Sequence, residues 1–397
     1  MPCNDGTIRA AQASWDICKS LLPLRKVAII CVDRANWGRL QCVAEVIRAH
    51  PALSLHVICG GSSVLDRFAC PADDIEQAGY SVSRVWHEVE GNSPLTMAMS
   101  LGHGCAEYAV ELQRCKPDAV MLIGDRYEAL GAACAAATMR IPIVHLQGGE
   151  VSGALDERYR HALTKLSDHH VPATERAKRN LLRMGEPEDS ILTVGCPSSD
   201  LAKRVTAHRG ESILCVYHPD TANPSDGRRE MYETLMGLSR LKRPISVWWP
   251  NVDAGSDSIS KAIREFGNCA WIEKLKNLAP LEYMQRLASA ALCCGNSSSF
   301  VRDASFFGTR VLLLGTRQDG RECADNVTRC EFITADHVEE HAKMLLRLGR
   351  CKPSTLYGDG HISERIVEAL LKLGPYRHKR LSYVDEAIPA DFEQVMA

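Results

Sequence analysis

The sequence predicts an α/β fold in which two doubly wound domains, each built on a parallel sheet, face each other across a cleft. Short runs rich in β-branched residues alternate with longer segments of helical period along the 397 residues. This alternation indicates parallel strands covered by helices. The short runs are apolar throughout, as in strands buried on both faces. They form two sets separated by the polar segment 204–212, which we interpret as the hinge.

Each strand candidate is one of these short apolar runs. In the first half of the chain they are 26–32, 55–59, 119–123, 141–146 and 191–194. In the second half they are 213–217, 245–249, 270–272, 291–294 and 311–314. Between them, apolar residues recur at the spacing of one helix face. Such helical patterns include 38–49, 97–114, 157–166, 174–184 and 280–289.

The pattern divides the chain into four parts. We expect an N-terminal extension over 1–24, with a helical pattern over 10–22, and a first domain over 25–207. A second domain covers 208–375, and the return of the C-terminal segment 376–397 to the first domain would fit the fold. Ligands of doubly wound sheets bind beyond the carboxyl ends of the strands, so the cleft is the expected site.

Composition and charge argue against several classes of protein. The chain carries 47 Lys and Arg against 49 Asp and Glu, a net charge of −2 with a pI of about 6.7. This balance gives no reason to expect a nucleic-acid partner. No apolar run approaches the roughly 18 residues of a membrane span, and the longest stretch of small residues, 129–139, is too short. The N-terminus lacks the basic-then-apolar pattern of a secretory signal, so we expect a cytoplasmic protein.

Cysteine usage indicates reduced thiols. The 17 cysteines are an odd number, no C-x-x-C pair occurs, and several lie inside apolar runs, where a thiol behaves as a small apolar side chain. The adjacent His169 and His170 have no third ligand at zinc spacing. We therefore expect neither disulfides nor a metal site.

Charged residues follow the first-domain strands where these end. Arg34 follows the first strand and leads through Gly38 into a helix, an arrangement suited to an anion. Asp125 and Arg126 follow the strand 119–123, where they either cap the next helix or face a ligand.

The next motif is His145-Leu-Gln-Gly-Gly-Glu150, followed by Asp156-Glu157 at the start of a helix. Paired glycines permit close approach of a ligand. Asp156 and Glu157 either complement the helix dipole or supply a general base in the cleft. His161 and Lys165 share a helix face, which meets either phosphate or solvent.

The second domain supplies a histidine and a serine-rich turn. His218, at the end of a strand, is either structural or a proton-transfer group. Asn296-Ser-Ser-Ser299 leads from a strand into a helix, a geometry that cradles phosphate with backbone amides and hydroxyls. Asp303 could bind ribose hydroxyls, and Arg317 and Arg321 add cationic donors. Neither G-x-x-x-x-G-K-[ST] nor G-x-G-x-x-G occurs here, which argues against a P-loop ATPase and a dinucleotide enzyme.

These motifs, in this order, resemble the hydrolysing UDP-N-acetylglucosamine 2-epimerases that make N-acetylmannosamine for sialic-acid synthesis. The resemblance spans roughly residues 26–372. The matching pieces are G-D-R-Y-E-A-L (124–130), G-G-E-V-S-G (148–153), R-H-A-L-T-K-L (160–166), G-C-P-S (195–198), H-P-D-T (218–221), P-N-V-D-A-G-S (250–256), G-N-S-S-S (295–299), G-T-R-Q-D-G-R-E (315–322) and Y-G-D-G (357–360).

The resemblance implies a glycosyltransferase-B-like fold of two Rossmann-like domains, with no required metal or redox cofactor and with a homo-oligomeric state. It implies removal of the C2 proton of a UDP-sugar, anti elimination of UDP and hydration of the glycal. Asp125, Asp156 and His218 match catalytic residues of the family, Glu157 remains a further candidate, and which group is base or acid stays open. The residues that match UDP contacts are Arg34, Ser297, Ser298, Asp303 and Arg317. Other residues of the same motifs that we expect around the substrate are Arg126, Gly149, Glu150, His161, Asn296, Gln318 and Arg321.

Four departures from the family pattern fall at the expected cleft. Gln147 stands where many members have a Glu, and an amide cannot transfer protons as a carboxylate does. Asn36 replaces an acidic residue, Phe300 replaces a Gly and should place bulk beside the phosphate site, and Asp303 replaces a longer Glu. The alternatives are therefore a divergent nucleotide-sugar hydrolase or glycosyltransferase of specialised metabolism on the same scaffold, or a UDP-binding regulator without turnover.

Overall fold

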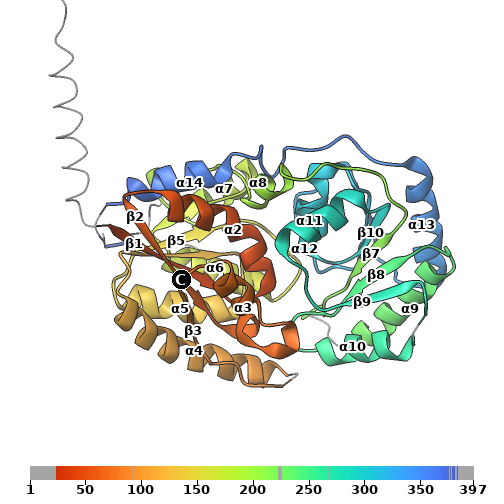
Figure 1. Cartoon of the computed structure of the whole chain (residues 1–397), viewed down its shortest axis with the longest axis horizontal. Coiled ribbons are helices and arrows are strands. Elements are labelled where there is room, and N and C mark those ends of the chain that lie inside the picture. The colour runs from red at the N-terminus through yellow and green to blue at the C-terminus, as the bar shows by residue number, and fades with distance from the viewer. Residues whose placement is uncertain are drawn as a thin grey trace, which may run out of the picture.

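The computed structural model describes residues 24–91, 93–221, 226–267, 269–374, 376, 378–380 and 382. This part of the chain forms two lobes side by side, each around a six-stranded parallel sheet (Figure 1). The predicted architecture of two doubly wound α/β units is confirmed. Within the described residues, no helix is both long enough and apolar enough to cross a membrane.

The first sheet has the strand order β3-β2-β1-β4-β5-β6. Its strands are β1 (Arg25–Cys31), β2 (Leu53–Cys59), β3 (Val82–Arg84), β4 (Ala119–Ile123), β5 (Ile143–Leu146) and β6 (His169–Val171). Chain order reverses between β1 and β4, and this switch point opens the crevice in which doubly wound folds bind ligands.

The second sheet repeats this topology as β12-β11-β10-β7-β8-β9. Its strands are β7 (Ile213–Val216), β8 (Ile245–Trp248), β9 (Ile272–Leu275), β10 (Leu292–Gly295), β11 (Val311–Leu314) and β12 (Val327–Cys330). The corresponding switch point lies between β7 and β10. The polar segment 204–212 links the lobes without helix or strand.

Helices cover both faces of each sheet (Figure 1). Those of the first lobe are α2 (Arg34–Ala49), α3 (Pro71–Gln77), α4 (Pro94–Cys115), α5 (Tyr127–Thr138), α6 (Asp156–Leu166) and α7 (Glu175–Arg183). α8 (Ser198–Ala202) precedes the linking segment. The later helices are α9 (Gly227–Ser239), α10 (Ser256–Glu265), α11 (Pro280–Ser289), α12 (Ser298–Arg302), α13 (Ala335–Leu348) and α14 (Ile362–Leu371).

The apolar strands are buried on both faces, as their composition predicts. Successive side chains of a strand point to opposite faces. Ile29 of β1 accordingly belongs to the core under α2 and α14, and Ile30 belongs to the core under α4 and α5. Cys293 and Cys294 divide in the same way between the two cores of the second lobe. All fifteen cysteines among the described residues are free thiols.

The prediction of a strand over 191–194 is wrong. Ile191 forms only an isolated bridge to His170, and the sixth strand is β6, which contains the histidine pair. The edge strands β3 and β12 escaped prediction because they are short and polar, with the sequences V-S-R and V-T-R-C. Burial on both faces, the feature that marked the other strands, is absent at a sheet edge.

The chain returns to the first lobe through α14, which packs against α2 (Figure 1). Ile362, Ile366 and Leu370 of α14 belong to the first-lobe core, and Arg25 of β1 donates to the carbonyl of Leu373 at 2.7 Å. This helix lies inside the range 208–375 assigned to the second domain, so the crossing occurs earlier than expected. The helix expected over 10–22 lies outside the described residues.

Candidate active site between the two sheets

A cleft opens between the carboxyl ends of the strands of the two sheets, and part of the predicted set of site residues lines it. It encloses about 1070 Å³ of space not filled by protein, part of it open to solvent. Such a size suits a small organic ligand. The predicted residues that line it are Arg34, Asp125, Arg126, Asp156, His218, Ser297, Ser298, Asp303 and Arg317.

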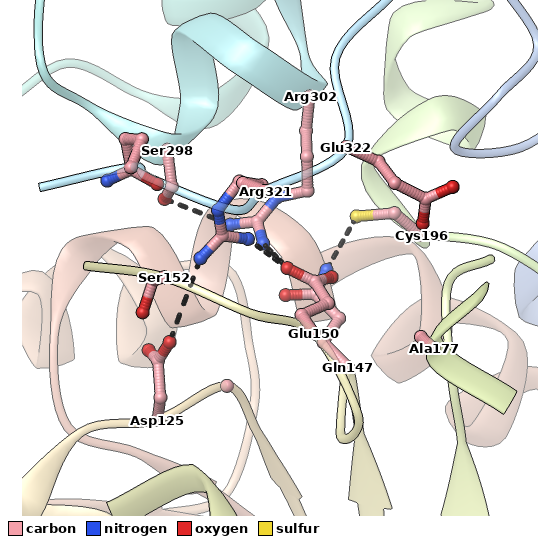
Figure 2. Close-up of polar contacts among 12 residues, drawn as sticks. Asp125, Gln147, Glu150, Ser152, Ala177, Cys196, Ser298, Arg302, Arg321 and Glu322 are labelled. Carbon is pink, nitrogen blue, oxygen red and sulfur yellow. Dashed lines mark hydrogen bonds and ion pairs between the residues drawn. The ribbon is translucent and has the colours of Figure 1, made fainter. Parts of the chain in front are cut away.

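Asp125 lies two residues after the end of β4 and stays ionised. Its carboxylate pairs with Arg160 of α6. Arg321 of the second lobe lies 4.0 Å from it (Figure 2). Burial alone would raise the pKa of Asp125, but the charges of Arg160 and Arg321 hold the pKa well below its ordinary value.

Asp156 begins α6, and its pKa is shifted in the opposite direction from that of Asp125. Burial raises the pKa of Asp156 to about 6, against the opposing charge of Arg317, whose Nη2 donates to Oδ2 of Asp156 at 3.2 Å. Two carboxyls in one cleft whose pKa values are driven apart can take different roles at the same pH.

Arg34 and Arg126 line the cleft but are held by protein groups. Arg34 donates across the cleft to the carbonyls of Trp249, at 2.8 Å, and Lys276. Arg126 is buried between Glu128, at 2.7 and 3.0 Å, and Asp253 of the second lobe, at 2.5 Å. Both arginines therefore join the lobes at the cleft.

His218 is a buried, neutral imidazole. Its backbone N–H donates to Oδ1 of Asn296 at 2.7 Å, and Nδ2 of Asn296 donates back to its carbonyl at 2.8 Å. Gln318 in turn donates to the carbonyl of Asn296 at 3.0 Å. Nδ1 of His218 accepts from the N–H of Asn251 at 3.3 Å, which places the ring proton on Nε2. Asn296 and Gln318 therefore hold the backbone of His218, and the N–H of Asn251 orients its ring. Burial lowers the pKa of His218 and neighbouring arginines lower it further.

The serine-rich turn forms the second-lobe wall. Ser297 caps α12 by accepting from the N–H of Ser299 at 3.4 Å, and Ser298 accepts from Arg302 at 3.0 Å. Phe300 is fully buried in the second-lobe core. The expectation that Phe300 places bulk beside the phosphate site is therefore wrong, because this position of α12 faces the sheet.

Glu157 and His161 do not line the cleft. Glu157 accepts from Arg160 and from the N–H of Ser152 at 2.9 Å, and it pairs with His161 at 3.1 Å. The His161 side chain is 44% exposed. Glu157 therefore holds Arg160, which in turn pairs with Asp125. These contacts favour the interpretation that Glu157 complements the dipole at the start of α6 over the interpretation that it is a general base.

Glu150 joins the lobes below the cleft rather than lining it. Its Oε2 accepts from Arg302 at 3.0 Å and from Arg321, both of the second lobe (Figure 2). Gly149 turns the chain there with φ of +77°, and a Cβ at this position would lie 2.3 Å from the carbonyl of Ala177. Gly149 is thus required by packing against α7, and neither residue is placed to touch a ligand in the cleft.

A family model of UDP-N-acetylglucosamine 2-epimerases matches residues 45–371. The chain belongs to this family. It is 31% identical over 373 residues to a UDP-N,N'-diacetylbacillosamine 2-epimerase (hydrolyzing) of Legionella pneumophila, covering 90% of this chain and 98% of that protein. It is 25% identical over 364 residues to a UDP-N-acetylglucosamine 2-epimerase of Neisseria meningitidis, covering 87% and 95%.

Solved structures of the family share the fold. The UDP-GlcNAc 2-epimerase of Methanocaldococcus jannaschii in complex with UDP-GlcNAc and UDP aligns with a TM-score of 0.71 at 17% identity. The Neisseria meningitidis enzyme bound to UDP-GlcNAc aligns with a TM-score of 0.70 at 16% identity. Each alignment covers 88% of this chain and 100% of the other. These enzymes have glycosyltransferase-B-like folds, and the predicted fold is confirmed.

Several residues of the site in this epimerase-family chain were not predicted. Those that line the cleft include Asp33, Arg39, Asn251 and Tyr283. Asp33 caps α2 by accepting from the N–H of Asn36 at 2.7 Å, and Asn36 accepts from the N–H of Val32 at 3.0 Å. Asn36 therefore stabilises the turn between β1 and α2. The N-cap preference of Asp was the available signal for Asp33, whereas no local pattern marks Tyr283. Among the described residues, no group of three or more His, Cys, Asp or Glu is arranged to hold a metal ion.

Proposed function

We propose that the protein is a hydrolysing 2-epimerase, which converts a UDP-linked 2-acetamido sugar and water to UDP and the free sugar inverted at C2. The observation that carries this proposal is the pair Asp125 and Asp156. One carboxyl is ionised and the other has a pKa of about 6, and both line the cleft opposite the serine-rich turn of the second lobe. Family membership and the UDP-sugar complexes of related enzymes support a UDP-sugar as the ligand.

In the first step the Asp156 carboxylate takes the proton from C2, since a base works best when its pKa is near the working pH. The C–H electron pair forms the C1–C2 double bond, the C1–O bond breaks, and UDP leaves with that bonding pair. The ionised Asp125 stabilises positive charge that develops at C1 as this bond breaks. In the second step water adds its hydroxyl to C1, and a proton from solvent enters C2 on the opposite face.

The second lobe supplies the groups that stabilise the leaving diphosphate. Arg317, Arg302 and the hydroxyls of Ser297 to Ser299 line the cleft in fixed positions. Donors held in place before the reaction stabilise developing negative charge more than mobile water does. Neutral His218 adds its Nε2–H as a further donor.

The substrate is tested by supplying the purified protein with UDP-N-acetylglucosamine or UDP-N,N'-diacetylbacillosamine, the sugars in the names of the relatives. We expect UDP and the C2-inverted free sugar in equal amounts from at least one of them, N-acetylmannosamine in the first case. UDP with an uninverted free sugar would instead support a hydrolase, and UDP binding without turnover of either compound would support a regulator.

Activity should depend on the ionisation of Asp156. Below a pH of about 6 its carboxyl carries a proton and cannot accept one, so kcat/KM should rise as the pH increases through about 6. The profile of kcat/KM between about pH 4.5 and about pH 8 checks this, since it reports the groups of the free enzyme. A profile that is flat across this range, or that falls through it, would contradict the assignment.

A further inference from the structure

Gln147 lies immediately behind the cleft and contacts one of its lining arginines. It follows β5, is buried, and has a left-handed backbone with φ of +64°. Its Oε1 accepts from Nη1 of Arg39 at 2.6 Å, and its Nε2 donates to Sγ of Cys196 at 2.8 Å (Figure 2 shows the second contact). Because a guanidinium only donates, the oxygen of the amide must face Arg39 and the nitrogen must face Cys196.

The contact continues from Gln147 to the second lobe through buried side chains. Sγ of Cys196 lies 2.9 Å from Oγ of Ser198, and that hydroxyl donates to Oδ1 of Asp303 at 2.7 Å. The direction is fixed where the series begins, since Arg39 can only donate, and the Ser198 hydroxyl donates to Asp303 where it ends. The position of Gln147 therefore requires one acceptor and one donor on the same side chain.

Arg39 itself carries a charge that no carboxylate pairs with among the described residues. Its side chain donates to the carbonyl of Ala35 at 3.0 Å and to Gln147. A Cβ at Gly124 would lie 3.6 Å from Nη1 of Arg39, so the guanidinium lies against the residue that precedes Asp125. The cation thus belongs to the wall of the cleft, beside a proposed catalytic carboxylate.

We propose that Gln147 is a positioning residue, which holds Arg39 toward the diphosphate of the substrate without neutralising its charge. This inference rests on the proposed function, because it needs a diphosphate in the cleft. A Glu at position 147 would form a charge-assisted pair with Arg39 and would lack the N–H that Cys196 accepts. With Gln instead of Glu at position 147, the Arg39 guanidinium then keeps its positive charge available for the diphosphate.

The test compares Gln147→Glu and Gln147→Met with the unchanged protein in calorimetric titrations of UDP and of uridine. We expect Gln147→Glu to weaken UDP binding at least tenfold, the equivalent of about 1.4 kcal/mol, and uridine binding less than twofold. Gln147→Met, which removes the acceptor without adding charge, should weaken UDP binding less. A purely structural role predicts the reverse order, because Glu is closer than Met in shape to Gln.

Two further variants make the test specific. Gln285→Glu introduces the same change at an exposed position of α11 and should leave both affinities unchanged. Adding Gln147→Glu to Arg39→Met should weaken UDP binding no further than Arg39→Met alone, because coupled residues are not additive. Equal losses for UDP and uridine, additive losses in the double variant, or unchanged UDP binding by Gln147→Glu would overturn the inference. Failure of the unchanged protein to bind UDP would instead refute the proposed function.

Discussion

Replacing Asp156 by Asn should lower kcat by about 10³-fold, within the range measured for general bases, while UDP binds as tightly as before or more tightly. The amide keeps the size of the carboxyl but cannot take the C2 proton. It also removes the negative charge that Arg317 now faces at 3.2 Å, which leaves that guanidinium free for the diphosphate. Steady-state kinetics and calorimetry with UDP measure the two effects separately.

The matched control for this prediction is Asp189→Asn, at an exposed position remote from the cleft, which should leave kcat unchanged. The pH dependence adds a second check, since the inflection near pH 6 should disappear in Asp156→Asn. A variant that keeps more than a tenth of the activity, or that loses UDP binding together with kcat, would show that Asp156 is not the base.

Replacing Glu150 by Ala should destabilise the protein by about 3–5 kcal/mol, the range for breaking a buried ion pair from one side. Glu150 is 7% exposed and lies between Arg302 and Arg321, which are 4% and 6% exposed. Without the carboxylate, two buried guanidinium groups of the second lobe would lose the first-lobe partner that they share (Figure 2). Urea unfolding followed by circular dichroism measures the loss.

Glu265→Ala is the matched control, because it removes a carboxylate that pairs with Arg228 at the surface. Exposed pairs contribute about 0–1 kcal/mol, so this variant should remain close to the unchanged protein. Equal effects for the two variants would mean that Glu150 does not hold the lobes together as its contacts indicate.

The doubly wound fold could be predicted from the sequence because strands that are buried on both faces are short runs of apolar residues, and such runs are visible locally. β4 and β11 coincide with the predicted runs 119–123 and 311–314, whose side chains are all buried. β3 and β12 lack that signature, since only one residue of each is buried, and β6 was missed because two of its three residues are histidines. The crossing of α14 depends on packing with α2, a contact between residues more than 300 positions apart in the chain, and no local pattern encodes it.

The candidate site, too, could be predicted from the sequence only in part. Asp125, Asp156 and His218 reach the cleft because strand ends and helix starts fix their positions, and those features are visible in the sequence. Glu150 and Gln147 belong to the same motifs but point into the protein, where their partners Arg302 and Cys196 come from distant segments. A motif predicts that a residue is near the site, whereas only the folded chain shows whether its side chain faces the cleft or supports it.

The reaction carried out in deuterium oxide tests the central claim most directly. If Asp156 removes the C2 proton and UDP is eliminated, the C2-inverted free sugar should carry one solvent-derived deuterium at C2 for each UDP released, which proton NMR and mass spectrometry can count. UDP released with the original hydrogen retained at C2 would contradict elimination and leave direct hydrolysis of the C1–O bond as the activity of this cleft.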